Sequence, residues 1–198
     1  MIIHEVEQNT PEWLELRKNK FTASNFGKLF MAKTTAGYNE LINRVVFERV
    51  TGELPESYSN EYMQRGHDLE PEAIQRYEFE TFRKVKRIGF VEMNEFIGCS
   101  PDGFVGDKGM VQVKVPKYST LIDYMISNKI PKDYSWQMQG ELWICEREWN
   151  DFFVYHPNLE PLRIRVSRDE AKIKELESEI EIAIETVQER INLIRKAS

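Results

Sequence analysis

The sequence predicts an α/β fold in which a mixed central β-sheet is flanked by helices. Helical periodicities fill residues 10–81, strand-like runs dominate residues 85–115, and two helices, two strands and a long final helix follow. A chain of 198 residues is long enough to bury a sizeable core in one domain. Because no repeat, linker or low-complexity stretch interrupts it, we expect residues 1–198 to form a single domain.

The first part of the chain contains recognisable helix ends. Thr10 and Pro11 are typical of an N-cap and a first helical position, and Gly52 is typical of the residue that follows a helix. Gly66 and Pro71 leave room for a bend in the longest helix. The predicted helices span residues 10–17, 21–30, 38–51 and 60–81, and loops at 33–37 and 53–59 connect them.

Strands and helices alternate in the second half. Residues 167–170 form a capping box, and apolar residues then recur at spacings of three and four from Ile173 to Ile194, which predicts an amphipathic helix of about eight turns. We expect this helix to pack on the sheet of its own domain; contacts between subunits are the alternative. The predicted strands are residues 85–93, 96–99, 110–115, 149–156 and 162–166, and the other helices are 118–128 and 135–145.

Composition favours a cytoplasmic globular protein. No apolar run reaches the ~18 residues that span a bilayer, and the N-terminus lacks a signal-peptide pattern, so we expect no membrane association. Cys99 and Cys145 are too few for a disulfide framework or a four-cysteine cluster and are expected to be core thiols.

The net charge of −6 counts mildly against nucleic-acid binding, but such binding needs only a local basic face. Each basic segment taken alone predicts only a solvated face. These segments are Arg17, Lys18, Lys20 and Lys28; Arg83, Lys84, Lys86 and Arg87; Lys129 and Lys132; and Arg163, Arg165 and Arg168.

Three polar side chains converge on one end of a predicted hairpin. Residues 100–103 form a turn, because Pro presets φ and Gly frees it. Gln112 and Lys114 lie on the strand that follows, and side chains two residues apart on a strand share a face. A carboxylate, an amide and an ammonium group therefore meet beside the turn that carries Asp102.

This group suggests phosphodiester hydrolysis, which requires an activated water and neutralisation of phosphate charge, and metal ions supply both. Mg²⁺ prefers oxygen ligands, usually one or two carboxylates with water and phosphate oxygens. Asp102 is the first candidate ligand, and Glu70 on the long helix is the second. The carbonyl of Val113 can serve as a neutral ligand, and Lys114 can orient the water or help to deprotonate it.

Five motifs occur in a characteristic order. They are Arg17 with Ser24, Arg65-Gly66-x-x-x-Glu70, Ser100-Pro101-Asp102-Gly103, Gln112-x-Lys114 and Gln137-x-Gln139-x-x-x-Trp143. Together they resemble the phage lambda exonuclease (YqaJ-like) family of alkaline exonucleases, over most of the chain. That family belongs to the PD-(D/E)XK nucleases, so the resemblance implies a restriction-endonuclease-like core with a mixed central sheet.

The resemblance implies a 5′→3′ exonuclease that acts on double-stranded DNA ends with Mg²⁺ or Mn²⁺. Such enzymes generate 3′ single strands for a partner single-strand annealing protein in phage recombination, in the cytoplasm of a bacterial host. The best-known members are homotrimeric rings, so the resemblance also implies a homotrimer.

The resemblance also assigns roles to residues. Glu70 and Asp102 correspond to metal ligands, Lys114 to the catalytic lysine, and Gln137 to a residue beside the metal site. Arg17 and Ser24 correspond to a pocket for the 5′-phosphate. Another residue, Met63, falls where the family places an apolar wedge that splits the terminal base pair; a core methionine is the alternative.

The chain departs from the family at Gln112, where the family has Glu. An amide keeps the shape of the side chain but loses its charge, so metal affinity and water activation should fall. Two hypotheses follow: an exonuclease crippled at this position, whether by design or by natural variation, or a nuclease fold that holds DNA ends without cutting them.

Overall fold

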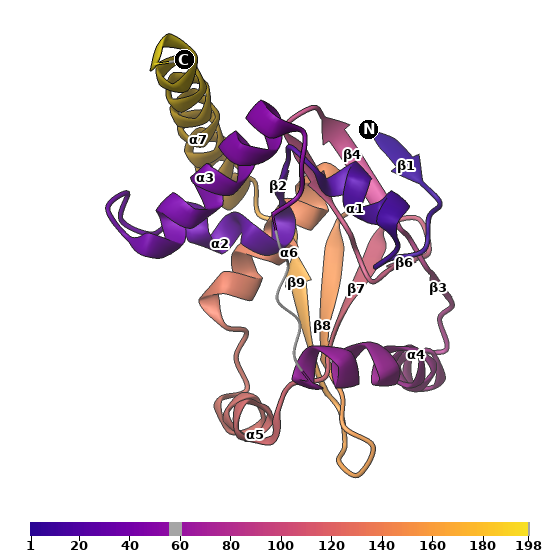
Figure 1. Ribbon diagram of the computed structural model, residues 1–198. Coiled ribbons are helices and arrows are strands. Elements are labelled where there is room, and N and C mark those ends of the chain that lie inside the picture. Colours follow the sequence, from indigo (N-terminus) through magenta and orange to yellow (C-terminus); the bar gives the residue numbers. More distant parts are fainter. Residues whose placement is uncertain (56–60, 198) are drawn as a thin grey trace.

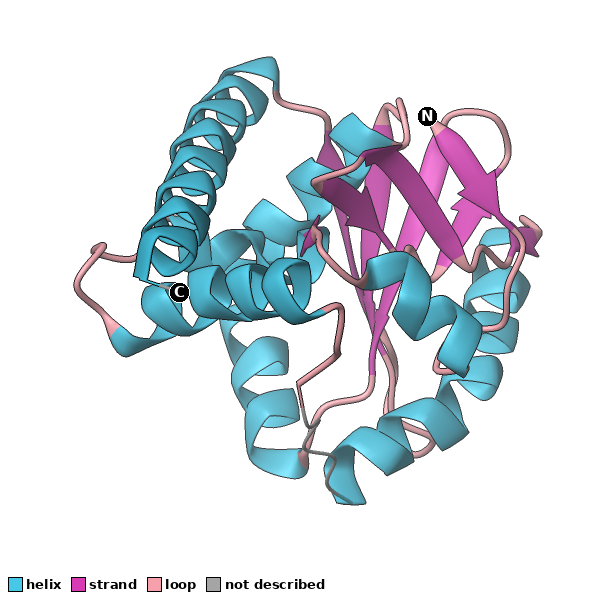
Figure 2. Ribbon diagram, turned by 45° about the horizontal axis from the view of Figure 1, so that its top comes forward, coloured by secondary structure: helices cyan, strands magenta, loops and turns pink. Residues whose placement is uncertain are grey.

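The computed structural model describes residues 1–55 and 61–197, and for residues 61–67 and Ala197 it describes the backbone alone. The strands form two mixed sheets, and helices surround them (Figures 1 and 2). The α/β class is confirmed, but the single central sheet of the prediction is divided in two. The predicted loop at 53–59 lies mostly outside the described residues. No described helix is long and apolar enough to cross a membrane.

The smaller sheet has the strand order β1-β4-β5-β2. Its strands are β1 (Ile2–His4), β2 (Phe21–Thr22), β4 (Phe90–Asn94) and β5 (Ile97–Cys99). The start of the second predicted helix is wrong, because Phe21 and Thr22 pair in parallel with β5. A 3₁₀ turn (Ala23–Asn25) and the short helix α2 (Phe26–Leu29) follow them.

The larger sheet has the order β3-β6-β7-β8-β9. Its strands are β3 (Val85–Lys86), β6 (Gly103–Val105), β7 (Gly109–Lys114), β8 (Trp149–Val154) and β9 (Leu162–Ser167). Only β7 and β8 are parallel neighbours among its described strands. Parallel strands need a crossover connection, and here α5 (Tyr118–Ser127) and α6 (Lys132–Ile144) supply it.

The run 85–93, predicted as one strand, is divided between the two sheets. β3 and β4 are separated at Gly89, which packs so closely on the N-terminal segment that a Cβ there would lie 2.1 Å from the carbonyl oxygen of Val6. The chain crosses from one sheet to the other at this contact. Local alternation of apolar residues does not reveal such a crossing.

The remaining helices are α1 (Pro11–Arg17), α3 (Ala36–Thr51), α4 (Glu61–Thr81) and α7 (Glu170–Ala197). The predicted cap of α7 is wrong: Ser167 ends β9, and Asp169 accepts hydrogen bonds from the backbone of Ala171 (3.0 Å) and Lys172 (3.2 Å) instead. The packing expected for this helix is also wrong. It lies mainly on α3, α6 and α2 rather than on a sheet, and its C-terminal end projects at the periphery (Figure 1).

Helices cover both faces of the larger sheet. α4 packs on one face through Ala73, Ile74 and Tyr77, and α5 and α6 pack on the other through Leu121 and Met138. Consecutive side chains of β7 and β8 therefore point alternately toward α4 and toward α6. This alternation decides which polar groups can meet.

A third group of buried apolar side chains, besides those on the two faces of the larger sheet, packs the smaller sheet against α2, α3, α6 and α7. Cys99 and Cys145 are buried free thiols within it, with their sulfur atoms 3.4 Å apart. The prediction of core cysteines is therefore confirmed.

Candidate active site

A hydrogen-bonded chain of polar groups starts at the turn between β5 and β6. Asp102 Oδ2 accepts hydrogen bonds from Gln112 Nε2 (2.5 Å) and from the backbone N–H of Val113 (2.7 Å). Gln112 Oε1 in turn accepts from Gln137 Nε2 (2.8 Å) on α6. The structure thus brings together the turn acid, the strand amide and the helix amide that the sequence singled out.

The same chain continues to two residues that sequence reasoning missed. Gln137 Nε2 also donates to Glu141 Oε1 (2.8 Å), and Asn150 Nδ2 donates to Glu141 Oε2 (2.9 Å). Glu141 is 1% exposed and Asn150 is 0% exposed. Glu141 follows Gln137 by four positions on a predicted helix, which places both on one face. That spacing was the available signal for Glu141, whereas nothing local pointed to Asn150.

Burial shifts both carboxylic acids of this chain toward the protonated form. Desolvation raises the pKa of Asp102 to about 6, while the Lys114 cation lowers it and the Glu70 carboxylate raises it further. Desolvation also raises the pKa of Glu141 to about 8, with a further contribution from Asp102. At neutral pH Asp102 is therefore mainly ionised and Glu141 mainly protonated.

The raised pKa of Glu141 predicts a pH-dependent loss of stability. Between the ordinary glutamate pKa near 4.5 and the folded value of about 8, the unfolded chain releases a proton that the folded chain keeps, so the free energy of unfolding falls as pH rises through this window. Glu141→Gln should remove this term. In urea titrations with EDTA, the variant should gain stability relative to the parent between pH 5 and pH 8. A difference independent of pH would contradict a protonated Glu141.

Two further charged groups lie beside the turn. Glu70 on α4 contacts the guanidinium of Arg87, but its buried Oε1 has no hydrogen-bond donor of good geometry. Lys114 follows Gln112 on β7, and its ammonium lies 4.7 Å from the centroid of the Tyr134 ring. Both charges act on the pKa of Asp102, which places them near its carboxylate.

The donor set around Asp102 fits a divalent cation that binds oxygen. The described hydrogen bonds of Asp102 fall on Oδ2, which leaves Oδ1 available, and Glu70 Oε1 is a buried carboxylate oxygen whose described contact is the ion pair with Arg87. The Val113 carbonyl points to the same side of β7 as its N–H, and hence toward Asp102. Mg²⁺ commonly takes one or two carboxylates, so this set is sufficient but sparse. Within residues whose side chains are described, no cluster of three His, Cys, Asp or Glu side chains is placed to hold a metal.

A second group of polar residues surrounds Arg17. Its guanidinium donates from Nη1 to Ser100 Oγ (2.7 Å) and from Nη2 to Thr22 Oγ1 (3.3 Å), and it lies 4.2 Å from the centroid of the Trp13 ring. Ser24 is exposed, and its hydroxyl is 3.3 Å from Thr22 Oγ1. Sequence reasoning identified Arg17 and Ser24 but missed Thr22 and Ser100.

The acid that acts on the Arg17 cation, Glu48, is itself ion-paired with Arg44 at 2.7 Å. In the part of the chain that the structure describes, no carboxylate forms an ion pair with Arg17. Burial, followed by the nearby Arg44 cation, lowers its pKa to about 10. A partly desolvated cation without a paired anion is less stable than one in water, and binding of an anion would offset that cost.

The two groups are joined through one turn. Ser100, which contacts Arg17, stands two residues before Asp102. Gln8 Nε2 donates to the carbonyls of Ile88 (2.8 Å) and Pro101 (3.1 Å), and so links this turn to the segment that contains Ile88. An anion bound at Arg17 would therefore lie at the turn that carries Asp102.

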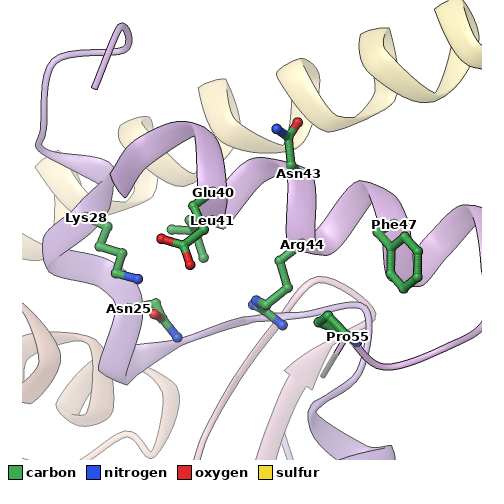
Figure 3. Close-up of a pocket in the computed structure, with 8 residues that line it drawn as sticks. All are labelled: Asn25, Lys28, Glu40, Leu41, Asn43, Arg44, Phe47 and Pro55. Atoms are coloured by element: carbon green, nitrogen blue, oxygen red, sulfur yellow. The ribbon is translucent and has the colours of Figure 1, made fainter. Parts of the chain in front are cut away.

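A pocket of about 580 Å³ adjoins the Arg17 group between α2 and α3 (Figure 3). Asn25 forms the junction, because it lines the pocket and donates to Thr22 Oγ1 (3.2 Å). Lys28 and Arg44 give the pocket a basic wall. Its lining residues are Asn25, Lys28, Glu40, Leu41, Asn43, Arg44, Phe47 and Pro55.

The predicted wedge residue, Met63, lies on α4, but its side chain is outside the described part of the structure, as is that of Arg65 in the same motif.

The two mixed sheets, the acidic turn and the strand that carries Gln112 and Lys114 define an α/β nuclease core of the PD-(D/E)XK type. The chain belongs to the YqaJ-like viral recombinase domain family, whose sequence model matches residues 12–148. No match was found among curated protein sequences.

Solved structures give the same assignment. The alkaline exonuclease LHK-Exo from Laribacter hongkongensis shares 31% sequence identity at a TM-score of 0.88, over 95% of this chain and 97% of that chain. LHK-Exo in complex with dAMP matches at 33% identity and a TM-score of 0.89, over 95% and 98% of the two chains. A phage-related exonuclease from Haemophilus somnus 129PT shares the fold, at 18% identity and a TM-score of 0.71 over 92% and 98%. The chain is thus homologous to alkaline exonucleases.

Proposed function

We propose that this chain is a single-domain, metal-dependent 5′→3′ exonuclease that acts on double-stranded DNA ends and leaves 3′ single strands for phage-type recombination. The half-buried Arg17, which forms no ion pair in the described residues and lies next to the Asp102 turn, carries this proposal. A guanidinium and nearby hydroxyls suit a terminal phosphate dianion, which would replace the missing acidic partner. A 5′-phosphate held there would place the first phosphodiester bond beside Asp102.

The residues around the turn have separate tasks. Asp102, Glu70 and the Val113 carbonyl would hold Mg²⁺ or Mn²⁺, which when bound neutralises phosphate charge and lowers the pKa of water. Lys114 supplies a fixed positive charge for the attacking water and for the charge that develops on the phosphate. Gln137 fixes Gln112, and Gln112 fixes Asp102, so the amides orient the carboxylate.

Gln112 gives the chain a weaker metal site than three acids would. Its Nε2 donates to Asp102, and its Oε1 already accepts a hydrogen bond from Gln137, so the amide does not present a free oxygen to a metal. This arrangement favours reduced activity in the chain as it stands. It equally favours the second candidate function, a module that binds DNA ends without cutting them, because Arg17 is intact in either case.

The central test compares linear duplex DNA that carries 5′-phosphates with covalently closed circles of the same sequence. We expect nucleotide release from the linear form alone, slow in Mg²⁺ and absent in EDTA. In Ca²⁺ or EDTA the chain should bind phosphorylated duplex ends in a gel shift, more weakly as salt rises. Binding without any nucleotide release in Mg²⁺ or Mn²⁺ would favour the end-binding module, and failure to bind ends at low salt would exclude both functions.

Arg17→Ala should reduce digestion of 5′-phosphorylated ends more than digestion of 5′-hydroxyl ends. A hydrogen bond to a charged group contributes about 1.5–3 kcal/mol, so the preference for phosphate should fall by about 10–100-fold. Initial rates on the two ends, measured in the Gln112→Glu chain, give this ratio. Arg147→Ala is the control, because it removes a half-buried arginine that binds the Gly106 carbonyl and does not contact the Arg17 group. Equal losses of activity on both kinds of end would show that Arg17 does not bind the 5′-phosphate.

The proposal extends to assembly and partners. A homotrimer would keep DNA threaded through a channel, and its 3′ strand would pass to a single-strand annealing protein in the cytoplasm of a bacterial host. The projecting end of α7 exposes Leu193 and offers one surface for subunit contact. Light scattering at the mass of one chain would reject the trimer.

A further inference from the structure

A basic pocket lies on the face of the larger sheet that packs on α4, away from the amide chain of the candidate active site. It encloses about 440 Å³ and is lined by Glu80, Thr81, Arg83, Asp151, Arg163 and Arg165. β8 separates the two sites, because consecutive residues on a strand point to opposite faces. Asn150 bonds Glu141 on α6, whereas Asp151 bonds Tyr77 on α4.

The acidic groups of this pocket already have partners. Arg165 binds both oxygens of Asp151, at 2.7 and 2.9 Å, and the Tyr77 hydroxyl donates to the same carboxylate at 2.8 Å. Glu80 pairs with Arg76, which does not line the pocket, at 2.7 Å, and Arg76 also pairs with Glu160 at 2.8 Å. Each acid that lines the pocket therefore has a cationic partner, but Glu80 shares its partner with Glu160.

Two of the cations have no such partner. Arg83 and Arg163 are exposed, and neither forms an ion pair with a carboxylate in the described residues. Three arginines and two carboxylates line the pocket, so its lining carries a net charge of +1 on a chain whose net charge is −6. Arg83 and Arg163, the two lining arginines without an ion pair in the described residues, can each contact one negative group of an anion.

Aromatic rings accompany these charges. The Arg165 guanidinium lies 3.7 Å from the centroid of the Trp149 ring, and that of Arg83 lies 5.2 Å from it. Phe79 and Phe82 come from the same end of α4 as Thr81 and Arg83, and they are 74% and 92% exposed. Phe82 also has φ of 54°, a left-handed conformation that is rare for an aromatic residue and that ends the helix.

We propose that this basic, aromatic surface binds single-stranded DNA. Arg83 and Arg163 would contact successive phosphates, and Phe82 would stack on an unpaired base. Single strands fit better than duplex, because only unstacked bases present their faces to exposed rings. The surface lies about 16 Å along α4 from Glu70, so a product strand could reach it. The identification of the bound strand as a product of digestion rests on the proposed function, whereas the binding of single-stranded DNA to this surface does not.

The test is fluorescence anisotropy of a labelled oligothymidylate of about 15 nucleotides in EDTA, where no cleavage occurs. The double variant Arg83→Ala/Arg163→Ala should bind at least tenfold more weakly than the parent chain. The slope of log affinity against log salt should fall by about 1.4, or 0.7 for each lost phosphate contact. The control, Lys174→Ala/Lys196→Ala, removes two exposed charges from α7 and should change neither quantity. Unchanged binding by the arginine variant, or equal losses in both, would overturn the proposal.

Further measurements distinguish base stacking from phosphate contacts, and single-stranded DNA from an acidic peptide. Phe82→Ala should weaken binding about fivefold or more without changing the salt slope, because it removes a stacking contact and no phosphate contact. The arginine variant should digest a short 5′-phosphorylated duplex at the parent's initial rate, so a failed nuclease assay does not bear on this surface. If the variant kept oligothymidylate binding but lost binding to a polyglutamate peptide, the pocket would take an acidic peptide and the proposal would be wrong.

Discussion

Gln112→Glu should raise Mg²⁺-dependent nucleotide release from phosphorylated linear duplex by about 100-fold, which corresponds to about 2.7 kcal/mol of transition-state stabilisation. The substitution replaces an amide that donates to Asp102 with a carboxylate able to share a cation with it. Without metal the two acids repel each other, so the pKa of Asp102 should rise further. With metal, the added ligand should strengthen binding. The thermal midpoint of the Glu variant should therefore respond more strongly to Mg²⁺ than that of the parent chain.

Gln112→Met is the matched control for this gain. It removes the hydrogen bond to Asp102 without adding a charge, so activity should stay at or below that of the parent. If the methionine variant gained as much as the glutamate variant, release of Asp102 rather than an added ligand would explain the effect. If the glutamate variant folded but stayed inert, the enzyme hypothesis would be wrong and the end-binding module would be preferred.

Asp102→Asn, introduced into the Gln112→Glu chain, should lower nucleotide release by at least about 1,000-fold. Asp102 is the acid on which the network converges, and the Asn variant removes its charge as a metal ligand while keeping an amide oxygen that can accept from Val113 N–H. Removing an interaction that stabilises transition-state charge typically costs about 10²–10³ in rate, and here a metal ligand is lost as well. End binding in EDTA should persist, because Arg17 and its hydroxyl partners are untouched.

Asp107→Asn is the control for this loss, because Asp107 is an exposed carboxylate on the adjacent hairpin loop. It should leave nucleotide release within about twofold of its parent, as is usual for surface substitutions. The parent chain offers a second check through pH. Because the pKa of Asp102 is raised to about 6, the apparent Mg²⁺ affinity should fall as pH drops through this value. If Asp102→Asn were as active as the Gln112→Glu chain that carries it, Asp102 would not be a metal ligand.

The contacts that sequence alone could predict are local ones. Asp102 and Gln112 meet because Asp102 directly precedes β6, which pairs with β7 as a hairpin. Strand alternation puts Gln112 and Lys114 on the same side of β7. Helix periodicity likewise found α3, α4 and the two crossover helices nearly in place. Both signals span few residues, so no knowledge of the tertiary fold was needed.

The remaining contacts depend on how distant segments pack. Arg17 and Ser100 are 83 positions apart, and the parallel pairing of β2 with β5 helps to bring their neighbourhoods together. Asn150 joins the network because β8 returns beside β7 after a two-helix crossover. Hydrophobic patterning cannot identify such partners, because it reports which face is buried and not which element covers it.

The position of Gln112 on β7 has a consequence for how the central strand is aligned. Gln112 is 2% exposed and lies between Val111 and Val113, which face the apolar layer beneath α4. If β7 slid past its neighbours by one residue, the amide would enter that layer and a valine would face Asp102. Such a slip would leave a buried amide and a buried carboxylate without partners, at a cost of about 1–3 kcal/mol for each polar group and more for the charge. The polar chain therefore selects one register for the sheet, whatever chemistry it performs.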